Sequence, residues 1–103
     1  MMYGTIFRIQ PKAGREQDVV SLVQEWNRSL GPTVPGARAV YLLRPGELVG
    51  VAVFDDEQTY RANAASPEQD AWYQRVREAL ETDPIWEDGP YLVATELARA
   101  GGR

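Results

Sequence analysis

The side chains best suited to holding a metal ion lie in one acidic run, Asp55-Asp56-Glu57. Mg²⁺ and Ca²⁺ prefer carboxylate oxygens, but consecutive helical positions point in different directions, and no EF-hand spacing follows this run. Acids in the first turn of a helix are favoured by its dipole, so we interpret the run as a helix start and predict no metal site. Lys12 precedes Gly14 without a surrounding glycine-rich loop, so we predict no phosphate site there.

The chain of 103 residues has no His and no Cys, which excludes whole classes of chemistry. It has no Ser-His-Asp triad, no Cys nucleophile, no thiolate-held zinc or iron–sulfur site and no imidazole for haem. Disulfides are also excluded, so the fold does not depend on an oxidising compartment. The net charge of −4 and the lack of a basic run disfavour nucleic acid. With no apolar segment typical of a signal peptide or membrane span, we expect a cytoplasmic protein without a membrane partner.

The elements that must position any functional side chain follow from the hydrophobic pattern. The expected order is strand, helix, strand, strand, helix, strand, with a short extra helix after the third strand. The expected ranges are strands at 3–10, 39–44, 48–54 and 91–97, a helix from Gly14 to Leu30, a short helix at 55–64, and a helix from Ser66 to about Pro84. This order predicts a single α+β domain over 1–103, a ferredoxin-like antiparallel sheet with helices on one face. We expect residues 98–103 to fray.

Local signals place individual residues on the two main helices. Trp26 lies on the apolar face of the first helix, so we expect it in the core. Ser66 is the predicted N-cap of the last helix, with Pro67 in its first turn and Gln69 as half of a capping box. Trp72 and Tyr73 lie on adjacent faces of the last helix, so we expect one in the core and the other in a pocket or at a dimer rim.

The third strand is apolar on both faces, which an isolated antiparallel sheet does not need. Val49, Val51 and Val53 alternate with Leu48, Ala52 and Phe54. A sheet with one wet face shows polar residues at alternate positions, so something must cover the second face. Because a twofold dimer is the commonest solution for a self-complementary surface, we predict a homodimer through the sheet face.

Taken along nearly its whole length, the chain resembles the dimeric α/β barrels of the antibiotic biosynthesis monooxygenase type. The strongest likeness runs from Phe54 to Asn63, where a strand-end aromatic precedes an acidic Gln-x-Tyr-Arg-x-Asn helix. Further likeness is carried by Pro11-Lys12-Ala13-Gly14, Val23-Gln24-Glu25-Trp26, Pro35-Gly36, Ser66-Pro67-Glu68 and Arg77-Glu78-Ala79-Leu80. The fold is indicated more strongly than the activity, since one fold hosts many activities.

The resemblance implies a pocket between the helices and the sheet in each subunit. In the branch that oxidises polyketides, this pocket holds a polycyclic phenol whose anion reacts with dioxygen without metal or flavin. Such chemistry suits a chain without His or Cys, because the substrate supplies the electrons. The protein would exclude water, orient the rings and stabilise the anion, with no bound cofactor.

Carried over position by position, the resemblance implies a catalytic pair of Tyr60 and Arg77, with Arg75 as the alternative to Arg77. Phe54 stands where the family has Trp, and Gly50 where it has Asn, so an indole N–H and an amide are absent. The implied substrate-binding residues are Phe7, Phe54, Asn63, Trp72 and Tyr73.

The same residues also suit purely structural roles. Two other functions are also alternatives. Tyr60 suits amphipathic packing, Arg77 suits a surface ion pair, and Asn63 suits a helix C-terminus. The alternative to an enzyme is a non-catalytic barrel that binds a small hydrophobic ligand or serves as an accessory subunit. A third hypothesis is haem binding, since Phe7, Asn63 and Tyr73 stand where the haem-degrading branch has Asn, Trp and a ligating His, and Tyr ligates ferric haem in other proteins.

Overall fold

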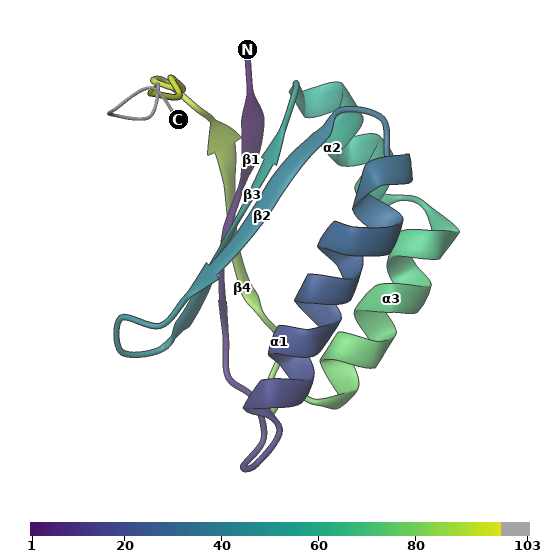
Figure 1. Ribbon diagram of the computed structural model, residues 1–103, viewed down its shortest axis with the longest axis vertical. Coiled ribbons are helices and arrows are strands. Elements are labelled where there is room, and N and C mark those ends of the chain that lie inside the picture. The colour runs from purple at the N-terminus through teal and green to yellow at the C-terminus, as the bar shows by residue number, and fades with distance from the viewer. Residues whose placement is uncertain (98–103) are drawn as a thin grey trace.

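Four antiparallel strands form one sheet, and three helices cover one of its faces (Figure 1). The computed structural model describes residues 1–97. The strands are β1 (Tyr3–Ile9), β2 (Ala37–Leu43), β3 (Leu48–Phe54) and β4 (Ile85–Pro90), in the spatial order β2-β3-β1-β4. The helices are α1 (Glu16–Glu25), α2 (Glu57–Ala64) and α3 (Pro67–Glu78). The predicted ferredoxin-like α+β fold is confirmed, while the predicted frayed tail at 98–103 lies outside the described residues.

The first helix is shorter and less regular than the sequence predicts. Gly14 has a φ of +76°, which belongs to a turn, so the helix begins only at Glu16. After Glu25 the chain makes a π-helical turn, Trp26–Leu30, and then a 3₁₀ turn, Gly31–Thr33. The predicted core position of Trp26 is confirmed, since the residue is only 4% exposed. Within residues 1–97, no helix combines the length and the apolar character needed to cross a bilayer.

Side-chain caps start the two later helices. The Asp56 carboxylate accepts a hydrogen bond of 2.8 Å from the Thr59 backbone N–H, so α2 begins after Asp56 and not at Asp55. Ser66 accepts one of 3.0 Å from the Gln69 N–H, which confirms the predicted cap of α3. The capping box is not completed by Gln69, because its side chain accepts a bond from Trp26 instead.

The last strand does not lie where the sequence predicts it. The prediction of a strand at 91–97 is wrong, because Ile85–Pro90 pairs with β1 and fills that edge. One further backbone bond, from Tyr91 N–H to Met2 C=O at 2.8 Å, follows this ladder. Strand propensity is high in 91–97 and low in 85–90, but pairing with the central strand decides the assignment.

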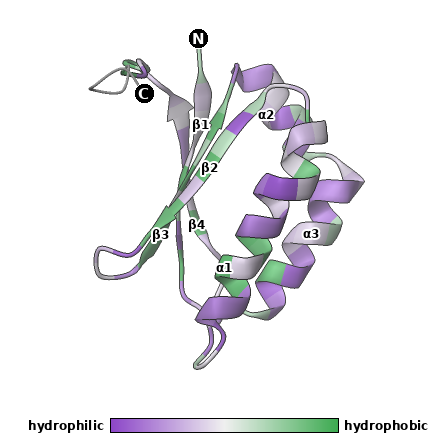
Figure 2. Ribbon diagram, in the orientation of Figure 1, coloured by the Kyte–Doolittle hydropathy of each residue, from purple (hydrophilic) through white to green (hydrophobic). Residues whose placement is uncertain are grey.

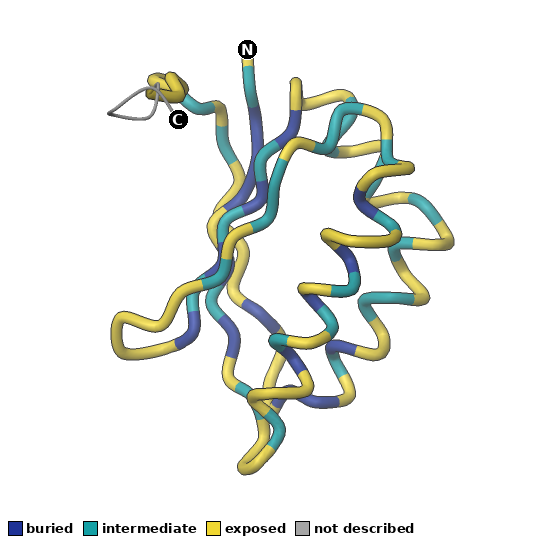
Figure 3. The backbone as a smooth tube through the Cα atoms, in the orientation of Figure 1, coloured by how far each residue is buried: buried dark blue, intermediate teal, exposed yellow. Residues whose placement is uncertain are grey.

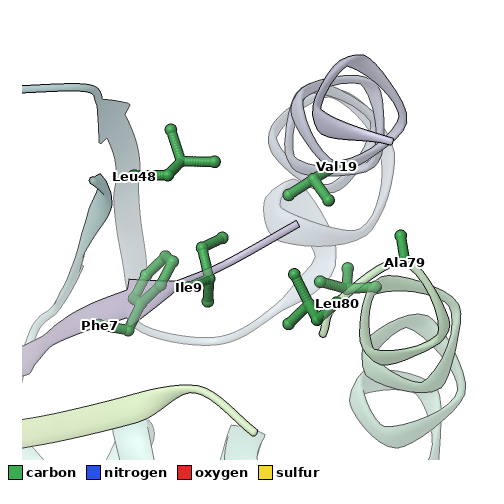
Figure 4. Close-up of a cluster of buried hydrophobic side chains, with 7 residues drawn as sticks. Phe7, Ile9, Val19, Leu48, Ala79 and Leu80 are labelled. Atoms are coloured by element: carbon green, nitrogen blue, oxygen red, sulfur yellow. The ribbon is translucent and has the colours of Figure 1, made fainter. Parts of the chain in front are cut away.

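One end of the sheet–helix interface holds a tightly buried aliphatic cluster. Val19 of α1, together with Ala79 and Leu80 after α3, is 0% exposed, and these side chains meet Ile9 and Leu48 of the sheet (Figure 4). We call this region the closed end. Apolar residues concentrate in the strands, while the helices carry many hydrophilic ones (Figure 2). Buried residues lie mainly in the two central strands, β1 and β3, and in single turns of α1 and α3 (Figure 3).

Candidate functional site

Next to the closed end, a cavity of about 460 Å³ lies between the sheet and the helices. This volume falls within the range of about 300–1,000 Å³ typical of small-molecule sites. All four strands and all three helices contribute to its wall. The wall includes Thr5, Phe7, Val40, Ala52, Phe54, Trp86 and Asp88 from the sheet, and Val23, Trp26, Tyr60, Arg61, Asn63, Gln69, Trp72, Tyr73 and Val76 from the helices and the turn after α1. We call this region the hollow end.

Aromatic rings form most of the frame of the hollow end. Phe7 lies 5.4 Å from Trp86 between ring centroids, and Trp86 lies 6.3 Å from Tyr73. The ring of Phe54 meets that of Tyr60 edge-on at 5.5 Å. Such tilted and edge-on pairs are the favoured geometries for aromatic contacts. The cavity therefore presents ring faces and edges that suit a flat apolar ligand.

The indole N–H groups of two tryptophans are used to fix the frame. Trp26 Nε1 donates to Gln69 Oε1 at 2.7 Å, and Trp72 Nε1 donates to the Leu22 C=O at 2.9 Å. Because both donors are satisfied inside the protein, the two indoles offer the cavity only apolar surface.

The polar groups gather at one side of the cavity. The Tyr60 hydroxyl donates to Asp88 Oδ1 at 2.9 Å. Arg61 Nη1 lies 3.7 Å from Asp88 Oδ2, and Arg61 also bonds Glu57 at 3.2 Å and the Tyr3 hydroxyl at 3.2 Å. The structure thus joins a phenol, a carboxylate and a guanidinium at the wall of an otherwise apolar cavity.

Burial, reinforced by the hydrogen bond to Asp88, raises the pKa of Tyr60 to about 12. Burial also raises the pKa of Tyr73. At neutral pH the Tyr60 hydroxyl therefore keeps its proton and is a hydrogen-bonding group. Deprotonation of a substrate by the Tyr60 phenolate is disfavoured, because the phenolate is scarcely populated at that pH.

The arginine predicted to accompany Tyr60 lies elsewhere. Arg77 Nε bonds Asp83 Oδ1 at 2.7 Å, and Arg75 makes two bonds to Glu25, at 2.7 and 3.1 Å. Neither arginine lines the cavity, so the prediction that one of them converges with Tyr60 is wrong. On α3 the residue between them, Val76, faces the interior, which turns both neighbours outward. Arg61 is the guanidinium that lines the cavity.

The five predicted binding residues all line the cavity: Phe7, Phe54, Asn63, Trp72 and Tyr73. Both Trp72 and Tyr73 reach it, where the sequence assigned one to the core. Their roles toward a ligand remain predictions. Asn63 Oδ1 is buried without a hydrogen-bond partner among residues 1–97.

Comparison with known proteins adds a family to this geometry. The model of the antibiotic biosynthesis monooxygenase family matches residues 2–75, well over half of the chain. The chain belongs to the antibiotic biosynthesis monooxygenase family. Among proteins of curated function, none matches it.

Solved structures agree on the fold of the monooxygenase family. A protein of unknown function from Nitrosomonas europaea is 22% identical with a TM-score of 0.76, covering 95% of this chain and 96% of its own. A proposed antibiotic biosynthesis monooxygenase from Caulobacter crescentus is 10% identical with a TM-score of 0.77, covering 89% and 91%. A dimeric ferredoxin-like protein of unknown function from Jannaschia is 14% identical with a TM-score of 0.73, covering 88% and 100%. At these identities the likeness establishes the fold alone.

The match to the monooxygenase family ends at residue 75, before Trp86 and Asp88. Neither residue was predicted as part of the site, because 85–90 fell between the predicted helix and the strand predicted at 91–97. Their period-two spacing was the available signal, since alternate residues of a strand share a face. Arg61 was missed for another reason: the resemblance directed attention to α3.

Gly50 has a structural reason in this member of the monooxygenase family. A Cβ atom at position 50 would lie 2.0 Å from Phe7 Cζ, closer than real contacts allow. The Phe7 ring thus occupies the space that a side chain at position 50 requires, and this part of the wall is apolar.

The acidic run after β3 is dispersed among separate partners. Asp55 Oδ1 accepts a bond of 2.5 Å from Arg38, Asp56 caps α2, and Glu57 pairs with Arg61. In the part of the chain that the structure describes, no three His, Cys or acidic side chains group as metal ligands would.

Proposed function

We propose that the protein is a monooxygenase-like enzyme that acts on an aromatic or polyketide-like small molecule without a bound cofactor. The observation that carries this proposal is the aromatic cavity with Tyr60, Arg61 and Asp88 on one side. Membership of the family supports the reaction class, and the cavity supports the ligand class. A flat ring system suits the spacing of the rings, and a ring hydroxyl suits the polar side.

The chemistry needs only the substrate and dioxygen. For an anthrone, two C–H bonds of the ring CH₂ break and a C=O bond forms to one oxygen atom. The second oxygen atom leaves as water with the two hydrogens, so the substrate supplies all the electrons. The protein excludes water and fixes the ring in one orientation. Arg61 takes the role foreseen for Arg77, and because Glu57 and Asp88 share its charge, it offsets only part of the negative charge that develops on the substrate.

A second copy of the chain covers the open face of the sheet in this proposal. Ile6, Tyr41, Leu43 and Ile85 are 41%, 61%, 56% and 62% exposed, and Val49 and Val51 lie between them on the same face. An apolar, self-complementary sheet surface suits a twofold pair. The mass by light scattering tests this, with a dimer expected and a stable monomer contradicting it.

The absence of two polar groups supports a second candidate, a barrel that binds a small hydrophobic ligand without catalysis. Phe54 supplies no indole N–H, and the Phe7 ring fills the place of an amide at position 50. Binding without oxygen consumption would favour this candidate.

Oxygen uptake with an anthrone separates the two candidates. We expect uptake by the wild type and a rate at least about tenfold lower for Tyr60→Phe, which loses a hydroxyl bonded to a charged group. Tyr41→Phe is the matched control, because Tyr41 lies on the open face, away from the cavity. Absence of oxygen uptake would refute the proposed oxidation. Equal rates in the wild type and Tyr60→Phe would show that Tyr60 has no part in the mechanism.

A further inference from the structure

Most donors on the polar side of the cavity are already committed within the protein. The single proton of the Tyr60 hydroxyl goes to Asp88 Oδ1. Thr5 is 4% exposed, and its one hydroxyl proton is shared between the backbone carbonyls of Ile6 and Glu87, each at 3.2 Å. Arg61 uses Nε and Nη2 on Glu57, and Nη2 also reaches the Tyr3 hydroxyl.

Acceptors on this side keep capacity for a further hydrogen bond. A hydroxyl has one donor and two lone pairs, so the Tyr60 oxygen keeps acceptor capacity after it donates to Asp88. The Asp88 carboxylate accepts from Tyr60 at Oδ1, its Oδ2 lies 3.7 Å from Arg61 Nη1, and its side chain is 28% exposed. Asn63 lies one turn after Tyr60 on α2, and its buried Oδ1 has no donor among residues 1–97. A ligand that carries a hydrogen-bond donor can therefore donate to one of these acceptors.

The charges on this side act against an anionic ligand. Asp88 contributes one negative charge directly at the cavity wall. The guanidinium of Arg61 is the nearest cation, but it is shared between Glu57 and Asp88. A carboxylate ligand would have to displace one of these partners and then lie beside the other negative charge, at a cost in free energy.

We propose that Asp88 is the specificity-determining residue of the cavity, because it holds the Tyr60 hydroxyl as an acceptor and selects ligands with an uncharged hydroxyl over carboxylates. Asp88 acts through Tyr60, so its role is one of positioning. The inference rests on the proposed use of the cavity as the ligand site. It does not depend on oxidation, so it holds equally for an enzyme and for a binding protein.

The affinities of two ligands that share one ring system test the proposal. 1-Naphthol carries an uncharged hydroxyl at neutral pH, whereas 1-naphthoate carries a carboxylate on the same ring. Their dissociation constants are measured by calorimetry for the wild type, Asp88→Asn and Asp55→Asn. Asp55→Asn is the matched control, because it changes charge at the same end of the sheet without lining the cavity. Thermal unfolding of each variant confirms that it is folded.

We expect the wild type to bind 1-naphthol at least about tenfold more tightly than 1-naphthoate, the ratio typical of one hydrogen bond to a charged group. Asp88→Asn should reduce this ratio about tenfold, and Asp55→Asn should preserve it. Asp88→Glu restores the carboxylate and should regain part of the preference, even where Asp88→Asn does not fold.

Three results would overturn the inference: equal affinity of the wild type for both ligands, an unchanged ratio in Asp88→Asn, or the same loss of preference in Asp88→Glu as in Asp88→Asn. Failure to bind either ligand would overturn it together with the proposed ligand site. Selective binding without oxygen uptake would leave it standing and refute only the proposed oxidation.

Discussion

The closed end and the hollow end lie between the same sheet and the same helices, yet the aliphatic cluster of the closed end is tightly buried and the hollow end leaves about 460 Å³. At the closed end, short aliphatic side chains such as Val19 and Leu80 interdigitate until they are 0% exposed. At the hollow end, large rings are fixed by hydrogen bonds and by one another, and Trp26 and Trp72 are 6.3 Å apart between centroids. Aromatic rings that are held by hydrogen bonds and by contacts with one another leave a cavity between them here, whereas the branched aliphatic side chains pack against one another without one.

The largest effect is expected at the closed end. Leu80→Ala removes a side chain that is 0% exposed and leaves a void in a tightly packed region, so it should lower the free energy of unfolding by about 2–5 kcal/mol. Urea denaturation measures this. Leu92→Ala is the matched control, because Leu92 is 85% exposed, and its expected effect is within about 0.5 kcal/mol. A comparable effect of the two substitutions would show that this region is not tightly packed.

A smaller effect is expected where the two ends meet. In Gly50→Ala, the new Cβ collides with the Phe7 ring, and relief of that overlap should cost about 1–3 kcal/mol of unfolding free energy. In combination with Phe7→Ala, the cost of Gly50→Ala should largely disappear, since the ring is gone. A double-mutant cycle measured by urea denaturation checks the coupling. Strict additivity would contradict the proposed collision.

The frame of the hollow end should weaken when a tryptophan loses its acceptor. Gln69→Leu leaves the buried Trp26 N–H unpaired, which should cost about 1–2 kcal/mol of unfolding free energy and shift the tryptophan fluorescence. Gln74→Leu removes an exposed amide whose hydrogen bond to Asp70 is long, at 3.4 Å, so neither quantity should change. Identical behaviour of both variants would mean that the bond does not fix the indole.

The smallest effect concerns Tyr60 and appears only at high pH. Its folded-state pKa of about 12 is above the ordinary value of 10.0, so the folded state holds the proton more tightly than the unfolded chain. The resulting stability is fully present below pH 10 and is lost as the pH rises from 10 to 12. Tyr60→Phe should therefore lose less stability over this interval than the wild type. Unfolding free energies across the interval test this, and an equal loss in the wild type and in Tyr60→Phe would contradict it.

The sequence predicted the sheet and helices wherever local signals agree with tertiary pairing. The alternating residues of β1 and β3, the cap at Ser66 and the burial of Trp26 are examples. Prediction of the last strand was wrong because Ile85–Pro90 contains residues that disfavour strands and forms one only through pairing with β1.

The candidate site was predicted only in part, for the same reason. Residues on α2 and α3 were found through the resemblance, as with Tyr60 and Trp72. The side chains of β4, Trp86 and Asp88, depend on a strand that local patterns do not indicate. The prediction of Arg77, with Arg75 as its alternative, failed because the direction of a side chain on α3 depends on which face of the helix meets the sheet.

The contact between Phe7 and Gly50 has a consequence for how the wall of this cavity can diversify. Because the ring of one residue fills the volume of the other, an isolated enlargement at position 50 carries a penalty. A variant that acquires an amide at position 50 therefore needs a shorter residue 7, and we expect substitutions at the two sites to occur in pairs.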